Sequence, residues 1–462
     1  MDLFRKKSIE QLLLDSQKKN GLRRCLNALD LTALGIGAIL GTGIFVLTGV
    51  AAAKYAGPAL VLSFVLSGIV CASAALVYAE FASMIPVAGS AYTYSYVSLG
   101  ELFAWIIGWD LMLEYALACS TVAIGWSGYF IKLLQGFGLN LPAWTTLSAG
   151  SGVQIDIPAV VIVLLITWLL STGVKESARI NNTMVFVKLL SVVIFILVAI
   201  FFIKPANWHP FIPFGWNGVF QGAAIVFFAY IGFDSVSTAA EEVKNPQKDL
   251  PRGIIASLII CSILYILVAA LLTGIVSYTL LDVSAPVAYA LQLINQNWAA
   301  GIISFGALFG ITTVLLVMLY AQTRVFYAMT RDGLLPKKFC YTHPKYKTPY
   351  KITWITGIIV AIIAAFMPID IAAEMVNIGT LAAFIFVSIA VIVLRRLKPD
   401  MPRAFRCPWV PVIPAFAVLF SFFLMLKLPG LTWIRFAVWL VIGIIVYFSY
   451  GYKHSNMNKE SR

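Results

Sequence analysis

Apolar stretches long enough to cross a membrane recur along nearly the whole chain, separated by short polar breaks. A helix needs about 20 such residues to cross a hydrocarbon core roughly 30 Å thick. Composition agrees, because 61% of the 462 residues are hydrophobic and 11% are charged, whereas a soluble domain has about 25% charged residues. The sequence therefore predicts an all-α polytopic membrane protein of about twelve transmembrane helices. The predicted spans are 30–55, 58–83, 97–133, 156–174, 182–203, 215–240, 252–277, 299–330, 350–367, 370–394, 411–427 and 431–451.

Positive charge is distributed unevenly between the predicted loops. If Met1 is inside the cell, the inner segments hold 27 of the 33 Lys and Arg residues. This asymmetry follows the positive-inside rule and predicts a multi-pass cell-membrane protein with both termini cytoplasmic. Because the net charge of +13 is explained in this way, nucleic acid is not expected as a partner. The basic stretch at 8–26 resembles an amphipathic segment on the membrane surface, and a solvated charged tail is the alternative.

Patterns typical of enzymes and metal sites are missing from the sequence. The six cysteines show no CxxC spacing and the three histidines are scattered, so we expect no disulfide, no metal site and no cofactor. The sequence contains no GxxxxGK[ST] motif for nucleotide binding. It also has no convergent set of catalytic residues and no repeated charge rings of the kind that channels use. We therefore expect neither an enzyme nor a channel.

Two of the predicted spans contain helix-breaking sequences. The first span includes the run Gly41-Thr42-Gly43, and the sixth places Gly232 and the acid Asp234 near its middle. Hydrocarbon tolerates an interrupted helix only where the freed backbone lines a cavity or is buried in protein; close helix packing is the alternative explanation for one such span. Because five is odd, a repeat of five spans reverses its orientation. Broken helices at matching positions of two such repeats predict the substrate site of an inverted-repeat transporter.

Three segments carry a family resemblance. They are "GIGAILGTGIF" in the first span, "FFAYIGFDSVSTAAEEVKNPQKDLPRGI" in the sixth, and the loop "YAQTRVFYAMTRDGLLP". Together they resemble the amino acid–polyamine–organocation superfamily, and within it bacterial members of the cationic amino acid transporter family. The resemblance covers roughly residues 25–450. It implies two inverted repeats of five spans, two additional spans, and transport of amino acids by alternating access.

The resemblance, the spans and the charge pattern together predict five regions. They are a cytoplasmic amphipathic N-terminal segment at 1–28, a first repeat at 29–203, a second repeat at 215–394, two additional spans at 411–451 and a cytoplasmic tail at 452–462.

Backbone groups at the two breaks are predicted to hold an amino acid by its charged ends. Amides at Thr42, Gly43 and Ile44 would form a helix N-terminus with a positive dipole, which suits an α-carboxylate. The carbonyls predicted to accept from the α-ammonium group lie near Ile39, Phe228, Ala229 and Ile231.

Two side chains complete the predicted substrate site. Phe228 resembles the aromatic gate that this family places over its substrate. Met318, in the eighth span, is expected to line the pocket for the substrate side chain, and the alternative is a gap-filling role in a helix interface.

Ionisable residues deep in the spans are the candidates for energy coupling, because an intramembrane charge is costly and is functional by default. Lys188 in the fifth span resembles the lysine of proton-coupled relatives, where an ammonium replaces the sodium ion of sodium-coupled ones; a permanently charged structural role is the alternative. Burial disfavours the charged form of a lysine. Glu114 lies one helical turn after Asp110 and is a candidate proton carrier. Asp234 matches an acidic position that the family places near the outer gate, and we expect it to bond to the Thr42 hydroxyl on closure.

The sequence leaves the substrate and the mechanism of coupling open. Cationic and small neutral amino acids are both compatible with it. Proton-coupled uptake is the favoured mechanism; exchange of one amino acid for another is the nearest alternative, and an amino-acid-sensing receptor is the alternative from another class. The expected partners are the substrate, protons and the lipid bilayer, with bound lipids or a small accessory membrane peptide as further candidates.

Overall fold

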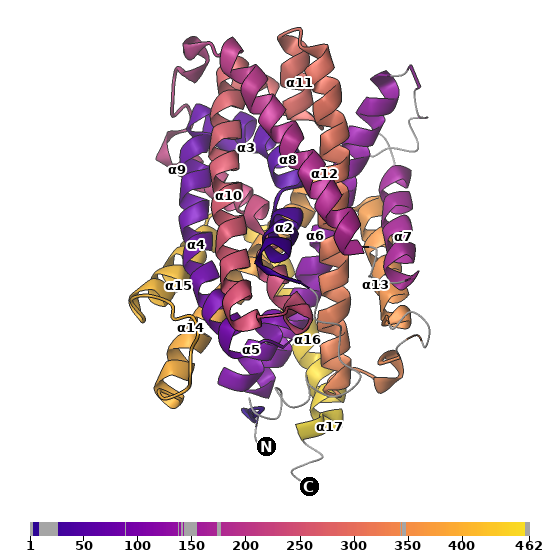
Figure 1. Cartoon of the computed structure of the whole chain (residues 1–462), viewed down its shortest axis with the longest axis vertical. Coiled ribbons are helices and arrows are strands. Elements are labelled where there is room, and N and C mark those ends of the chain that lie inside the picture. The colour runs from indigo at the N-terminus through magenta and orange to yellow at the C-terminus, as the bar shows by residue number, and fades with distance from the viewer. Residues whose placement is uncertain are drawn as a thin grey trace.

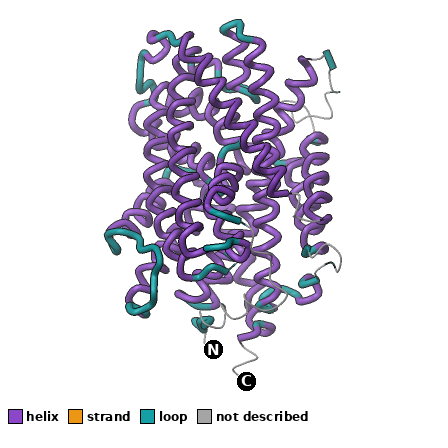
Figure 2. The backbone as a smooth tube through the Cα atoms, in the orientation of Figure 1, coloured by secondary structure: helices purple, strands orange, loops and turns teal. Residues whose placement is uncertain are grey.

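The computed structural model describes residues 3–8, 26–87, 89–136, 138–139, 142, 155–172, 177–341, 343 and 348–457, without the side chains of 177–180, 241 and 242. Within these residues the chain is helical, and its extended backbone pairs at one bridge, between Leu26 and Val243 (Figure 2). The predicted all-α fold is therefore confirmed. Most of the predicted N-terminal amphipathic segment, residues 9–25, lies outside the described part.

The predicted number of spans agrees with the helices of the structure. Eight described helical stretches are long and apolar enough to cross a membrane, and four further apolar helices are shorter. The long ones are Gly43–Met84, Glu101–Gly136, Asn181–Phe202, Gly215–Ala240, Pro246–Ile275, Asn297–Arg331, Ile369–Leu397 and Gly430–His454, and the short ones are Ala28–Ile39, Ile157–Thr172, Tyr350–Phe366 and Val412–Met425. Since Gly43–Met84 joins the second half of the first span to the whole of the second, these stretches account for twelve spans.

Most spans correspond to a single α-helix in Figure 1. In chain order the elements used below are α2 (Ala28–Ile39), η1 (Gly43–Leu47), α3 (Thr48–Ala51), η2 (Ala52–Ala56), α4 (Leu60–Met84), α5 (Ser90–Ser98), α6 (Glu101–Gly136), α7 (Ile157–Thr172), α8 (Ser177–Ala199), α9 (Gly215–Val226), η7 (Phe227–Tyr230), η8 (Asp234–Glu242), α10 (Pro246–Ile275), α11 (Pro286–Leu293), α12 (Asn297–Arg331), α13 (Tyr350–Phe366), α14 (Ile369–Leu397), α15 (Val412–Met425) and α16 (Gly430–Val446).

The start of the third span was predicted too early. We expected it at residue 97, but the polypeptide there forms the end of the separate short helix α5, and α6 begins at Glu101. Gly100 separates the two helices with a φ of +103°. Only glycine adopts this conformation readily, so the helix cannot continue through it.

The helices pack in pairs that match across a shift of five spans. The second span contacts the seventh (α4 with α10), the third the eighth (α6 with α12), and the fourth the ninth (α7 with α13). The contact of α2 with α10 has its counterpart in that of α9 with α4, and the contact of α8 with α12 in that of α14 with α6. A repeat of five helices predicts this pattern.

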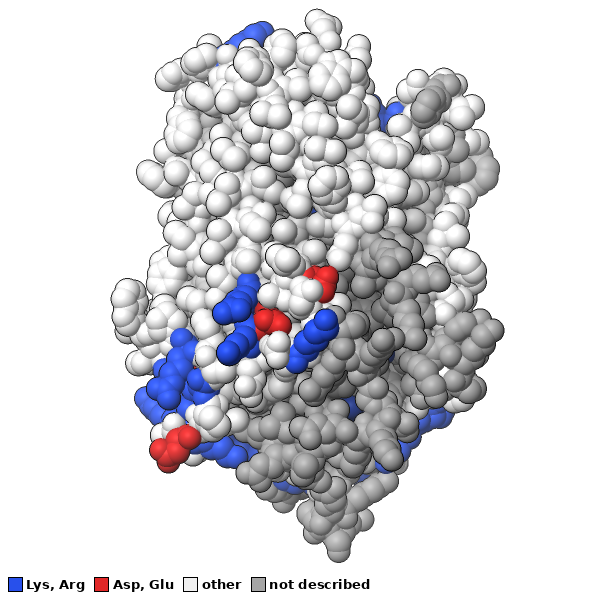
Figure 3. Space-filling view, in the orientation of Figure 1, with Lys and Arg blue, Asp and Glu red and all other residues white. Residues whose placement is uncertain are grey.

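Both chain ends lie at the same end of the molecule, below in Figure 1. On the face shown in Figure 3, most of the visible Lys and Arg side chains gather toward that end. An even number of spans with one strongly basic end has this arrangement.

Two glutamates to which the sequence assigned no role anchor the terminus end. The Glu80 carboxylate, fully buried, accepts from Arg395 at 2.6 and 2.9 Å and from the Cys407 N–H at 2.7 Å. Glu101, also fully buried, accepts from the hydroxyls of Tyr96, Tyr447 and Ser455 at 2.6 to 3.0 Å. Each carboxylate therefore connects segments that are far apart in the sequence. These connections stabilise the helices around the two broken spans.

Candidate functional site

The first span is interrupted where its glycines predict. An Asn27–Asp30 capping box starts α2, and the helix ends at Ile39 because Leu40 is extended, with φ −82° and ψ 94°. The helical conformation resumes at Thr42 and continues as the wide turn η1. At the start of this second half, Thr42 and Gly43 have no earlier turn to which their N–H groups can donate.

Ile44 does not belong with these free amides. Its N–H donates to the Gly41 carbonyl oxygen at 3.2 Å, as does that of Phe45. The predicted carboxylate seat therefore narrows to Thr42 and Gly43, because the wide turn already uses the next amide.

The sixth span is interrupted at Ile231 and Gly232. The helix α9 tightens into η7, Ile231 is extended with ψ 138°, and Gly232 has a φ of +117° before the chain re-enters helical turns in η8. A side chain at Gly232 would meet the Ala38 carbonyl oxygen at 2.9 Å and the Met318 methyl group at 2.7 Å. Only glycine supplies both the backbone conformation and the space.

The two interrupted spans touch each other at their breaks. A Cβ added to Gly43 would overlap the backbone of Ala229. The elements η1 and η7 are in contact at this point. Glycine therefore allows the amide end of one half-helix to approach the carbonyl end of another.

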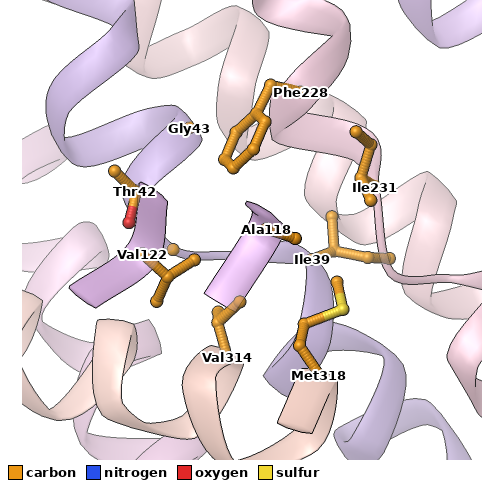
Figure 4. Close-up of a pocket in the computed structure, with 10 residues that line it drawn as sticks. Ile39, Thr42, Gly43, Ala118, Val122, Phe228, Ile231, Val314 and Met318 are labelled. Atoms are coloured by element: carbon orange, nitrogen blue, oxygen red, sulfur yellow. The ribbon is translucent and has the colours of Figure 1, made fainter. Parts of the chain in front are cut away.

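A small enclosed cavity lies beside this contact (Figure 4). Its volume, measured for the centre of a water-sized sphere, is about 10 Å³, which is room for roughly one water molecule. The residues around it are Ile39, Gly41, Thr42, Gly43, Ala118, Val122, Phe228, Ile231, Val314 and Met318. In Figure 4 the Phe228 ring lies on one side of the cavity and Val314 and Met318 lie on the opposite side.

Most of the predicted substrate residues meet at this cavity. Ile39, Thr42, Gly43, Phe228, Ile231 and Met318 line it, whereas Ile44 and Ala229 are buried behind it. Sequence reasoning missed Ala118, Val122 and Val314. The first two lie four residues apart on one face of α6, but nothing distinguishes that face from the other apolar faces of the helix.

The carbonyls predicted to be free have a partner that the sequence did not reveal. The Tyr265 hydroxyl, on α10, lies 2.8 Å from the Ile39 oxygen and 2.7 Å from the Ala229 oxygen. A hydroxyl has one proton to donate. It can therefore satisfy one of these carbonyls at a time, and the other keeps its capacity to accept.

Lys188 lies against the broken first span. Its ammonium group is fully buried. It donates to the carbonyl oxygens of Gly37 and Leu40 at 2.9 Å each and to the Thr313 hydroxyl at 3.0 Å. All three N–H donors of the ammonium are thereby used, and they connect α8 to both α2 and α12.

The expected bond between Asp234 and Thr42 is not formed. Asp234 accepts instead from the Tyr115 hydroxyl at 2.5 Å, and the Thr42 hydroxyl has no hydrogen-bond partner among the described residues. Asp234 begins η8, which packs on α5 toward the terminus end, whereas Thr42 begins the half-span that leads to the opposite end through α3. The two side chains therefore lie on opposite sides of the breaks.

Glu114 and Asp110 lie deep in the protein rather than at its surface. Their exposed fractions are 1% and 3%. Asp110 packs against Gly379 of α14. Both Glu114 oxygens and the Oδ1 atoms of Asp110 and Asp234 lack hydrogen-bond partners within the described part of the chain. These three carboxyl groups therefore keep unused hydrogen-bonding capacity inside the protein.

Comparison with known proteins gives consistent results. The amino acid permease family matches residues 26–450. The chain is 55% identical to a branched-chain amino acid permease and 55% identical to a methylthioribose transporter, both of Bacillus subtilis, and each alignment covers 99% of both chains. It is 32% identical to a vacuolar cationic amino acid transporter of Arabidopsis thaliana, over 99% of this chain and 96% of that one.

Proposed function

Because the chain belongs to the amino acid permease family, we propose that it is a secondary active transporter that takes up amino acids by alternating access, driven by protons. The observation that carries this proposal is the meeting of two broken spans at a small closed cavity. Freed backbone donors and acceptors at such breaks recognise the groups that all amino acids share. The side chains around them are then left to select among amino acids.

The substrate lies between the two breaks in this proposal. Its carboxylate accepts from the amides of Thr42 and Gly43, at the positive end of a half-helix. Its ammonium group donates to the carbonyl oxygens of Ile39 and Ala229, where the single Tyr265 proton leaves one acceptor unoccupied. Phe228 closes over the substrate.

The lining favours a neutral, apolar substrate side chain. All side chains around the cavity are uncharged, and Thr42 is the only one among them with a polar group. A cationic side chain would lose its hydration without gaining a carboxylate partner. Alanine and the branched-chain amino acids are therefore the proposed substrates, a choice that agrees with the printed name of one relative.

The size of the cavity supports alternating access. A space of about 10 Å³ admits roughly one water molecule and no amino acid. Entry of a substrate therefore requires the half-helices to separate, first toward one membrane face and then toward the other. The breaks at Leu40 and Gly232 provide the hinges, since they are the points where helical hydrogen bonding is already lost.

Proton coupling is assigned to two buried sites. A protonated Lys188 holds the first span against the fifth and eighth with three N–H donors, and loss of its proton leaves two donors for the oxygens of Gly37, Leu40 and Thr313. Glu114 and Asp234 form the second site, because neighbouring buried carboxylates favour binding of a proton. The two sites would titrate as a coupled set.

Orientation and organisation complete the proposal. Both termini face the cytoplasm, because the basic side chains visible in Figure 3 gather at their end. The two five-span repeats at 29–203 and 215–394 would form the transport unit, and the spans within 411–451 would pack beside it. The membrane is then the cell membrane.

Uptake into proteoliposomes tests this function. We expect an inward proton gradient, without sodium, to drive accumulation of alanine, leucine, isoleucine and valine, and arginine to be a poor substrate. The panel includes methylthioribose, because one relative is named a methylthioribose transporter. Accumulation that depends on internal amino acid would indicate an exchanger, and binding without any flux would indicate a receptor.

Replacing Met318 by serine is expected to widen the substrate pocket. The Met318 side chain, 2% exposed, fills the cavity opposite Phe228, and serine would leave room for a longer substrate. We expect uptake of arginine relative to alanine to rise by roughly tenfold, the range that one or two methylene groups control. Competition between the two amino acids measures the ranking, and an unchanged ranking would mean that Met318 only fills space.

Replacing Tyr265 by phenylalanine is expected to weaken transport without unfolding the protein. The ring would keep its packing on Phe64 and Tyr230, but both breaks would lose their shared donor. We expect a loss of roughly tenfold in kcat, because an unsatisfied buried acceptor in the empty carrier costs about 1–3 kcal/mol. Tyr129→Phe is the matched control, since that hydroxyl binds the Phe45 oxygen, beyond the breaks. Equal losses in the two variants would argue against a special role for Tyr265.

A further inference from the structure

A second and larger pocket lies at the end of the molecule opposite the termini. It is formed where the turn before α16 approaches the start of α9, and α16 leads from this turn directly to the C-terminal end. Its volume is about 330 Å³, within the usual range for small-molecule sites. Its lining residues are Tyr55, Asn217, Gln221, Ile225, Leu426, Lys427, Leu428 and Pro429.

The cation in this pocket is half-buried and lacks an acidic partner. Lys427 donates to the Asn217 Oδ1 atom at 3.1 Å and lies 5.3 and 5.9 Å from the ring centroids of Phe423 and Phe220. Within the described part of the chain no carboxylate forms an ion pair with it, whereas Lys54, near the same end, pairs with Asp282 at 3.2 Å. A cation held among aromatic rings without a counter-charge favours an anionic ligand group.

Amide donors surround the same position. The side-chain oxygen of Asn217 accepts from Lys427. The NH₂ group of the same amide has two N–H donors for a ligand. Gln221, one helical turn later on α9, adds a second amide to the lining. An ammonium with two amide groups is a set of donors that a carboxylate accepts from well.

Acidic and basic side chains both lie near Tyr55, which lines the same pocket. Glu374 and Asp370, in the first turns of α14, are close enough to act electrostatically on the Tyr55 hydroxyl, and so is Lys54. Glu374 accepts from the Thr432 hydroxyl at 2.7 Å. The surroundings of Tyr55 therefore carry both signs of charge, and Lys427 is the group that favours an anionic ligand group.

The outer pocket and the central cavity share one helix face. Gln221, Ile225 and Phe228 follow each other at spacings of four and three residues, so they share one face of the sixth span. Gln221 and Ile225 line the outer pocket, and Phe228 lines the central cavity. The two pockets therefore follow one another along this face.

We propose that this pocket is a second, outer amino-acid site, in which Lys427 holds the carboxylate of the substrate before it passes Phe228. The proposal rests on the proposed transport function and extends it to a second place of binding. Because the outer pocket is present while the central cavity is closed, it would load substrate while the central site is inaccessible.

Equilibrium dialysis of tritiated L-leucine with the purified full-length protein tests the proposal. We expect two binding components in the parent protein. Gly43→Val should remove the central component and leave the outer one, and adding Lys427→Gln to that variant should remove the remaining binding. If the Gly43→Val protein binds no leucine, or if Lys427→Gln does not alter its binding, the outer site is wrong.

Uptake by the Lys427→Gln single variant gives a second readout that does not depend on Gly43. We expect its initial rate to fall by roughly tenfold at leucine concentrations well below KM, the effect of losing one charge-assisted hydrogen bond, and to equal the parent at saturation. Lys204→Gln is the matched control, because that lysine is exposed near the same end and lies outside the pocket. Equal effects in both variants would mean that only the general surface charge matters, and would overturn the site.

Three further outcomes distinguish failure of the outer site from failure of the proposed function. If Lys427→Gln leaves leucine binding intact but reduces the phosphatidylglycerol that copurifies with the protein, the pocket holds a lipid headgroup and the proposal fails. If the parent protein transports no amino acid at all, the proposed function fails. If the parent transports leucine normally while the Lys427→Gln variant is indistinguishable from it at every concentration, only the outer site fails.

Discussion

Replacing Gly43 by valine is expected to abolish amino acid uptake while the protein remains folded and extractable. A Cβ at this position would overlap the backbone of Ala229, at the contact between the two broken spans. The valine would therefore push apart the half-helix that presents amides to the substrate and the one that presents carbonyls. Uptake into proteoliposomes, with size-exclusion chromatography of the purified variant, measures both parts of the expectation.

Gly301→Val provides the matched control for this experiment. Gly301 lies in α12, and no atom lies near the place where its side chain would project. Both variants add the same side chain to a glycine in a membrane helix. They differ only in the neighbouring atoms: the new side chain meets Ala229 at Gly43 and open space at Gly301. Uptake kinetics of Gly43→Val that equal those of the parent would remove Thr42 and Gly43 from the proposed site.

Replacing Lys188 by alanine is expected to abolish accumulation driven by a proton gradient. The change removes the ammonium donor of the Gly37 and Leu40 carbonyls. Gly37 keeps the Thr313 hydroxyl at 3.2 Å, whereas an unsatisfied buried acceptor at Leu40 costs about 1–3 kcal/mol. The first span then loses its attachment to the fifth and eighth spans. Accumulation of L-alanine in sodium-free proteoliposomes, with the interior more alkaline than the exterior, gives the measurement.

Lys132→Ala tests whether loss of any lysine has this effect. Lys132 is an exposed residue of α6, and we expect its variant to accumulate alanine like the parent. Lys188 has no part in coupling if its variant concentrates alanine equally well. Proton coupling itself is wrong if accumulation follows an imposed sodium gradient and ignores pH. Obligate exchange predicts no uptake into vesicles that lack internal amino acid, whatever the pH difference.

Much of the framework was predictable because it depends on local backbone chemistry. Helical hydrogen bonding fails near glycine runs in a membrane span, and both breaks lie where Gly41 and Gly232 predict them. The environment of Lys188 was predictable for an energetic reason. A buried ammonium group inside a span requires hydrogen-bond acceptors. The carbonyls freed by the break in the first span accept from Lys188.

Contacts between side chains of different helices were not predictable in the same way. Asp234 faces Tyr115 rather than Thr42, because the direction in which each half-helix leaves its break decides which residues meet. Tyr265 occupies the predicted ammonium position, yet its sequence context is that of any aromatic residue in an apolar span. Such contacts depend on the angle through which each helix is rotated about its axis relative to its neighbours. The spacing of residues along the chain does not predict that angle.

The position of Tyr265 bears on the half of the transport cycle in which nothing is carried. A symporter must return to its starting orientation with an empty site, and bare carbonyls inside the membrane would make that return slow. The Tyr265 hydroxyl lies between the two carbonyl acceptors. In the proposed cycle it takes the place of the substrate's ammonium group when the site is empty. The same hydroxyl competes with every arriving substrate, which limits how tightly the carrier can bind. In the proposed cycle, weaker substrate binding is therefore linked to a faster return of the empty carrier.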